Sequence, residues 1–222
     1  MLIVVAGSKG GVGTTTVSAG LVVKSPGPVL AMDLTGTGHL GECLERDMLE
    51  AGDLMRRGVA GIQEVLRRQQ SVVVVFTEQD RALYPDAATV IARAALASRT
   101  IIVDAGRLIP PGLLPLASVL VMVTVPDVRA LRSLEQMNLG RVGARVVVLE
   151  NMVEGESLYP QAWEAIPMAR KTGFRSLMRG AMGQTLQRLV AELIPSPSPA
   201  VALASVEEPG ILRSAVRRLA GG

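Results

Sequence analysis

A glycine-rich stretch near the start of the chain has the composition of a phosphate-binding loop. Residues 7–16 read G-S-K-G-G-V-G-T-T-T and directly follow an apolar run. In the general pattern G-x-x-x-x-G-K-[S/T], Gly7 and Gly13 are the glycines and Thr15 is the hydroxyl residue that ligates magnesium. The lysine position holds Thr14. The loop therefore has the residues for phosphate binding but lacks its usual cation.

The other residues of this loop also have a predicted task. We expect its glycines to adopt backbone conformations closed to residues with a Cβ, so that N–H groups point at phosphate oxygens. These glycines are Gly7, Gly10, Gly11 and Gly13. A helix that begins near Thr14 would add its unpaired N–H groups. Lys9 stands out because the chain has 20 arginines and only three lysines, so we expect this lysine to have a function.

Apolar runs and helical patterns alternate along the chain, and they must position this loop. Strands are predicted at 2–6, 28–33, 71–76, 100–104, 118–125 and 145–150. Helices are predicted at 14–24, 50–69, 86–98, 127–139 and 175–194. This alternation predicts an α/β fold, with a doubly wound, mainly parallel sheet and helices on both faces. Ligands bind at the carboxyl ends of such strands, and four motif positions lie there: Gly7, Asp33, Asp104 and Asn151.

Composition limits the class of protein. With 222 residues the chain is long enough for one α/β domain and short for two. Its residues are 49% hydrophobic but only 2% aromatic, which suits aliphatic strands buried on both faces. The formal net charge of +3 does not predict nucleic-acid binding. The arginine pairs Arg56-Arg57 and Arg67-Arg68 are most simply a solvated helix face, and contact with DNA or a partner is the alternative. A single cysteine and no apolar segment of membrane-spanning length lead us to expect a cytoplasmic protein.

The string K-G-G-V-G-T-T resembles the deviant Walker A motif, K-G-G-x-x-K-[T/S], of the ParA/MinD superfamily of SIMIBI-type P-loop NTPases. A loop without the second lysine is similar to that of the CpaE/TadZ branch, the pilus-associated localisation ATPases. The resemblance implies that Lys9 is the signature lysine, which reaches across a nucleotide-sandwich homodimer to the partner's phosphates. It also implies that the loop binds ATP and Mg²⁺ through Gly7, Lys9, Gly10, Gly11, Val12, Gly13, Thr14, Thr15 and Thr16.

Downstream positions extend this resemblance. Asp33 ends the second predicted strand, but Thr35 stands where the family has a second acid that positions water. Asp104 ends a strand that resembles Walker B, and Asn151 resembles the asparagine that reads adenine. The implied catalytic residues are Lys9, Asp33 and Asp104. The implied magnesium ligands are Thr15, Asp33 and Asp104.

Two groups expected of an efficient ATPase are missing, at Thr14 and Thr35. Loss of one phosphate-binding donor costs ~2–4 kcal/mol of transition-state stabilisation. Loss of the acid removes the obvious group for orienting water. Lys9 of a partner would restore part of the charge. We therefore expect ATP binding with weak or partner-activated hydrolysis, and whether the chain is an enzyme stays open.

The stretch 36–41, G-T-G-H-L-G, matches a dinucleotide fingerprint but lacks the acidic residue that should follow about 20 positions later. We interpret it as a flexible loop beside the nucleotide. His39 and Cys43 lie four positions apart, and two residues do not make a metal site.

The end of the chain differs from the rest. A nucleotide-binding domain is predicted over 1–194, a Pro/Ser-rich linker over 195–206 and a short basic amphipathic helix over 207–222. One face of this helix carries Ile211, Leu212, Ala215, Val216 and Leu219. Such a helix can lie on an anionic membrane, and it resembles the membrane-targeting helix of MinD. The alternative is docking on the domain or a dimer contact.

Three function classes follow. The first is a ParA/MinD-like dimerising switch that positions a pilus or secretion assembly, the division site or another cargo, together with a localisation or activating protein. The second is a pseudo-ATPase scaffold that acts through a constitutive dimer or partner surface. The third, a P-loop kinase or synthetase, is disfavoured by Thr14 and by the lack of a recognisable second-substrate site. For the switch we expect a cytoplasmic location, with peripheral contact at the inner face of the cell membrane through Ile211–Leu219.

Overall fold

The computed structural model describes residues 1–69, 71–96, 99–137, 142–153, 164–167 and 174–194. Within them, eight strands form one sheet in the order β3-β4-β2-β5-β1-β6-β7-β8, and each neighbouring pair is parallel. The strands are β1 (Leu2–Gly7), β2 (Val29–Asp33), β3 (Met48–Glu50), β4 (Ser71–Val75), β5 (Thr100–Gly106), β6 (Val119–Thr124), β7 (Arg145–Val153) and β8 (Glu164–Pro167).

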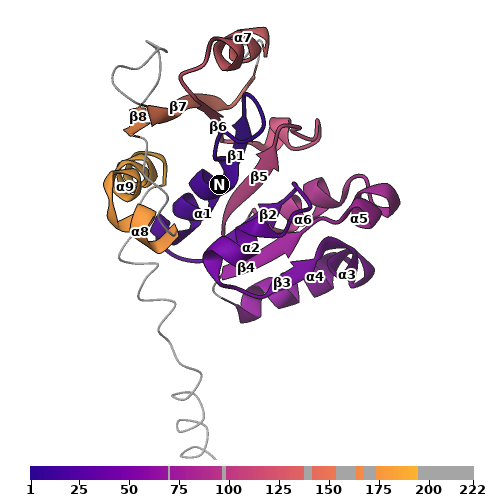
Figure 1. Ribbon diagram of the computed structural model, residues 1–222. Helices are drawn as coiled ribbons and strands as arrows, with labels where there is room; N and C mark the ends of the chain where they lie inside the picture. Colours follow the sequence, from indigo (N-terminus) through magenta and orange to yellow (C-terminus); the bar gives the residue numbers. More distant parts are fainter. Residues whose placement is uncertain (70, 97–98, 138–141, 154–163, 168–173, 195–222) are drawn as a thin grey trace, which may run out of the picture.

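Helices cover both faces of this sheet (Figure 1). They are α1 (Thr14–Lys24), α2 (His39–Leu44), α3 (Ala51–Arg56), α4 (Gly58–Arg68), α5 (Glu78–Leu83), α6 (Ala87–Ala95), the 3-10 turn η1 (Leu114–Leu116), α7 (Val128–Gln136), α8 (Phe174–Arg179) and α9 (Ala181–Leu193). No helix of the described part is long and apolar enough to cross a membrane. The predicted linker and terminal helix lie outside the described residues.

Two apolar layers enclose the sheet because successive strand residues point to opposite faces. In β1, Leu2 and Val4 join the core formed with α3, α4, α6 and α7. Ile3 and Val5 join the core formed with α1, α2, α8 and α9. Each of these β1 side chains is fully buried. The predicted doubly wound α/β fold is thereby confirmed.

The strand prediction is confirmed at all six places, whereas several helices differ from expectation. The helix predicted over 50–69 is divided at Gly58, whose φ of 66° does not fit a helix. The helix predicted over 175–194 is divided at Gly180. The expected loop at 36–41 contains the start of α2 instead. Strands β3 and β8 and helix α5 were not predicted.

The register of the sheet brings the predicted site residues to one edge. Asp33 at the end of β2 pairs with Asp104 of β5, and Asp104 also pairs with Val5 of β1. The phosphate-binding loop leaves β1 directly after that point. On the other side, β7 ends beyond β6, which carries Asn151 toward the same edge. The carboxyl ends of β2, β5, β1 and β7 therefore surround the loop.

Candidate functional site

The phosphate-binding loop is compact, and three of its four glycines are required by its shape. A Cβ on Gly7 would lie 2.7 Å from Cγ2 of Val12, which is too close. Gly11 and Gly13 have φ angles of +76° and +91°, which favour glycine. Gly10 has no positive φ, and a Cβ there would meet nothing within 4 Å. The expectation that the loop conformation demands glycine was therefore wrong for Gly10.

The loop leads into α1, whose N-terminus keeps its backbone donors. Thr14, Thr15 and Thr16 form the first turn of α1, and no side chain caps it. No acidic residue lies in this turn. Free N–H groups at a helix N-terminus favour an anion. Thr14 is buried beside Gly7, so the site offers backbone donors where most such loops add a lysine.

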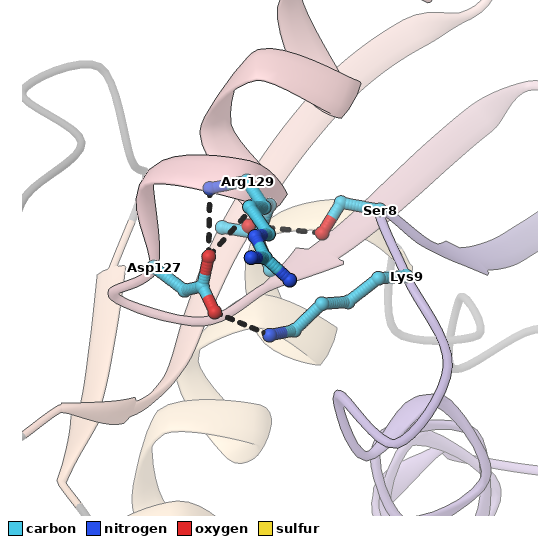
Figure 2. Close-up of polar contacts among 6 residues, drawn as sticks. Ser8, Lys9, Asp127 and Arg129 are labelled. Carbon is cyan, nitrogen blue, oxygen red and sulfur yellow. Dashed lines mark hydrogen bonds and ion pairs between the residues drawn. The ribbon is translucent and has the colours of Figure 1, made fainter.

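Lys9 does not lie free beside this loop but forms an ion pair within its own chain (Figure 2). Its Nζ atom lies 2.6 Å from Oδ2 of Asp127. The other oxygen of Asp127 accepts hydrogen bonds from the N–H groups of Arg129 and Ala130, at 2.7 and 3.3 Å, and so caps α7. The hydrogen bond from Lys9 is the main reason why the pKa of Asp127 is lowered. Both side chains are more than a third exposed, so solvent screens the pair and it adds little to the stability of the fold.

A second contact ties α7 to the loop. The hydroxyl of Ser133 donates to the carbonyl oxygen of Ser8 at 2.7 Å. Ser8 in turn donates from its own hydroxyl to Thr124 at 3.0 Å, and from its N–H to the carbonyl of Val123 at 2.9 Å. The start of the loop is therefore fixed to the end of β6 and to α7.

The carboxylate of Asp33 is engaged by the chain itself. Its Oδ1 accepts from the N–H and the hydroxyl of Thr35 at 2.9 and 2.5 Å. Its Oδ2 accepts from the N–H of Leu40 at 3.4 Å. Asp33 is fully buried, so these bonds hold the turn between β2 and α2. Its predicted catalytic and magnesium-binding roles stay predictions, and the geometry gives it a structural task.

Asp104 is different because one of its oxygens has no partner. It is fully buried, and Oδ1 accepts from the N–H of Gly106 at 3.2 Å, whereas Oδ2 makes no hydrogen bond. Burial raises the pKa of Asp104 to about 6, against the lowering effect of the Thr15 hydroxyl and the Gly106 N–H, and Asp33 raises it further. Buried polar atoms are rarely left unpaired, so this oxygen calls for a ligand.

A magnesium ion fits the free oxygen of Asp104. Oxygen ligands suit Mg²⁺, which keeps several waters and binds through one or two carboxylates together with substrate phosphates. Among the described residues, no group of three or more His, Cys, Asp or Glu side chains could hold a metal alone. Thr15, Asp33 and Asp104 are therefore predicted ligands of a magnesium ion that also needs phosphate.

Asn151 contacts the loop directly. Its Nδ2 atom donates to the carbonyl oxygen of Val12 at 2.8 Å, and the residue is buried. A Cβ on Gly13 would lie 2.4 Å from the same nitrogen, so glycine makes room for the amide. In this structure the Asn151 amide braces the loop. Its predicted role in reading adenine stays a prediction.

A cavity of about 980 Å³ opens beside the loop. Its lining comes from the loop and the start of α1, from the turn after β2, from α5 and from the segment after β5. Its lining includes Arg81, Tyr84 and Ile109, which the sequence reasoning missed. The pattern T-E-Q-D at 77–80 is a capping-box signal that could have located α5.

Replacing Asp104 with asparagine is expected to stabilise the fold above pH 6. The pKa of Asp104 rises from 3.8 to about 6 on folding, so the folded chain binds the proton more tightly and stability falls as pH rises through that range. The buried charge thus lowers the free energy of unfolding by up to about 3 kcal/mol at pH 8. Urea unfolding at pH 4 and pH 8 measures this.

A matched control is Asp80→Asn, because the Asp80 carboxylate is also buried but has hydrogen-bond partners in Gly52 and Thr77. It should destabilise the chain. Loss of stability in Asp104→Asn at pH 8 would contradict the unpaired state of Oδ2.

Solved structures share this fold, whereas no family model and no curated protein matches the chain. The chain is similar to the ParA family ATPase of Chlorobium tepidum TLS, with a TM-score of 0.65 and 17% identity over 88% of this chain and 92% of that one. It is similar to a chain of the MinC:MinD cell division protein complex of Aquifex aeolicus, with a TM-score of 0.64 and 18% identity over 89% and 97%.

A third similar structure is the septum site-determining protein MinD of Pyrococcus horikoshii OT3 complexed with Mg-ADP, with a TM-score of 0.63 and 17% identity over 88% and 97%. At such identities the likeness is one of fold, and the narrower resemblance to the CpaE/TadZ branch stays a prediction. The chain has the fold of the ParA/MinD ATPases.

Proposed function

We propose that the chain is a nucleotide-dependent dimerising switch that positions a cargo or assembly in the cell. The observation that carries the proposal is the unpaired buried oxygen of Asp104 beside a phosphate-binding loop with free backbone donors. Bound Mg²⁺ and ATP would supply a phosphoryl group whose charge the metal partly neutralises. The chain's own residues bind the phosphates through the N–H groups of the loop and hold the metal through Asp104 and Thr15.

Lys9 supports the dimerising part of the proposal. Its ammonium group pairs with Asp127 at the surface, where solvent screens both charges and little free energy is needed to separate them. A partner's phosphates can therefore compete for it. When Lys9 leaves, the cap of Asp127 on α7 does not depend on it, because a different oxygen makes that cap. Lys9 would then exchange its ion pair with Asp127 for one with the partner's phosphates, and this exchange would link nucleotide binding to the association of two subunits.

Hydrolysis is proposed to be weak. Thr14 offers no charge, and the Asp33 carboxylate is occupied by Thr35 and Leu40 rather than free to orient water. The same observations favour the alternative, a pseudo-ATPase scaffold with a constitutive dimer or partner surface. Single-turnover hydrolysis by the full chain separates the two, because a scaffold releases no phosphate.

Replacing Lys9 with alanine is expected to abolish nucleotide-dependent dimerisation, because the partner's phosphates lose their cation. Asp127→Asn keeps a good helix cap but removes the competing ion pair, so it should dimerise at a lower concentration than the parent chain. Size-exclusion chromatography with light scattering, with a non-hydrolysable ATP analogue and Mg²⁺, measures both. Lys24→Ala is the control. If Lys9→Ala forms dimers with the same dissociation constant as the parent chain, Lys9 does not exchange Asp127 for the partner's phosphates.

Asn151→Ala is expected to weaken the binding of ATP, GTP and inorganic tripolyphosphate by the same factor. The reason is that its amide braces Val12 of the loop, and a buried hydrogen bond of this kind is worth ~1 kcal/mol. Isothermal titration calorimetry gives the three affinities. A loss confined to ATP would instead support adenine reading by Asn151.

We further propose that the terminal helix predicted over 207–222 gives peripheral membrane contact, and that a localisation or activating protein is a further partner. The MinC:MinD complex among the similar structures supports a partner protein. Full-length chain should float with liposomes that contain anionic lipid, whereas a chain ending at Pro199 should not. Equal flotation of both chains, or of neither, would contradict the membrane role.

A further inference from the structure

The cavity beside the phosphate-binding loop has basic residues in its lining. Arg81 on α5 and Arg107 after β5 both line it. Within the described residues neither arginine forms an ion pair with a carboxylate. Lys9 also lines the cavity, but Asp127 neutralises it. Two arginines without an ion pair therefore line the same cavity as the loop whose usual lysine is Thr14.

Arg81 is held in place, as a binding residue should be. Its Nη1 donates to the carbonyl oxygen of Leu34 at 3.0 Å. Gly36 has a φ of +78°, and a Cβ there would lie 2.8 Å from Nη2 of Arg81. The turn after β2 is therefore shaped to seat the guanidinium. Both arginines are exposed, but Arg107, unlike Arg81, has no hydrogen bond among the described residues.

The helix that carries Arg81 is itself anchored. A capping box begins α5, in which Thr77 accepts from the N–H of Asp80 and Asp80 accepts from the N–H of Thr77, each at 3.1 Å. The second oxygen of Asp80 accepts from the N–H of Gly52 at 3.0 Å. This short helix is thereby fixed both to the end of β4 and to α3.

Leu34, whose carbonyl oxygen binds Arg81, donates its own N–H to the carbonyl oxygen of Asp104 at 2.9 Å. Leu34 directly follows β2, and β2 is the neighbour of β5, which ends near Asp104. Neighbouring strands lie about 4.8 Å apart. A magnesium ion at Asp104 bridges the terminal phosphates of a nucleotide. A terminal phosphate on that ion would thus lie at the same edge of the sheet as the seat of Arg81.

We propose that Arg81 binds the terminal phosphate of ATP within its own subunit and supplies the positive charge that Thr14 does not. The inference rests on the proposed nucleotide binding. A guanidinium can bind phosphate through two N–H groups at once, and it is always charged. A side chain that binds the terminal phosphate distinguishes ATP from ADP, because ADP lacks that phosphate. Unlike Lys9 of a partner, it acts without dimerisation.

Calorimetry on the full chain with Mg²⁺ gives the affinities for ATP and for ADP. All variants carry Lys9→Ala as a background, because this change removes the lysine that a partner subunit would contribute. Arg81→Ala should weaken ATP binding about tenfold or more and leave ADP binding within about twofold. Arg81→Lys should restore part of the loss. Arg93→Ala is the matched control, because Arg93 is an exposed arginine on α6 outside the cavity lining.

The variant Arg81→Gln distinguishes a structural role of Arg81 from phosphate binding, because glutamine keeps a hydrogen-bond donor for Leu34 but carries no charge. It should melt at the same temperature as the parent and still lose ATP affinity. Equal losses for ATP and ADP, or ATP affinity unchanged in Arg81→Ala, would overturn the role of Arg81 while leaving nucleotide binding intact. A parent chain that binds neither nucleotide would overturn the proposed function as well.

Discussion

The parallel register of β2, β5 and β1 is the constraint on which the rest of the site depends. It sets Asp33 beside Asp104 and places Asp104 beside the strand from which the phosphate-binding loop leaves. A slip of one residue would turn every side chain of a strand to the other face. The two apolar layers prevent this, because each layer accepts only alternate residues of β1. Aliphatic packing thus determines where the polar chemistry lies.

Buried polar groups around the loop are satisfied almost completely by the chain itself. Asp33 holds the turn before α2, Asn151 holds Val12, and Ser8 bonds to Thr124. These bonds make the site rigid before any ligand binds, which lowers the entropic cost of binding. Asp104 is the exception within this set. The cost of burying its unpaired oxygen is borne by the fold, which is typical of functional positions.

The sequence predicted the strands, and a parallel sheet with helices on both faces, well because buried parallel strands are continuous apolar runs with little ambiguity. It predicted the short elements poorly. Strand β3 has three residues, and α2 and α5 have six each, too few for a periodic pattern. For α5 the capping residues Thr77 and Asp80 were a usable signal.

The polar contacts of the site could not be predicted from the sequence because they join residues that are far apart along the chain. Lys9 and Asp127 lie 118 positions apart, and Asn151 lies 139 positions from Val12. No local pattern specifies that a side chain of α7 or β7 will meet the loop, because this depends on how the strands are ordered. The resemblance indicated which residues matter but not that Asp33 and Asn151 are engaged by the chain.

The double role of Asp127 has a consequence for the surface around α7. While Lys9 is present, the first turn of α7 carries a neutralised carboxylate beside the exposed side chain of Val128. Once Lys9 binds elsewhere, the same surface becomes more negative by one charge without any movement of the backbone. An approaching protein with basic groups would therefore meet a different electrostatic field in each state. The α7 surface would then differ in charge according to whether Lys9 is paired with Asp127.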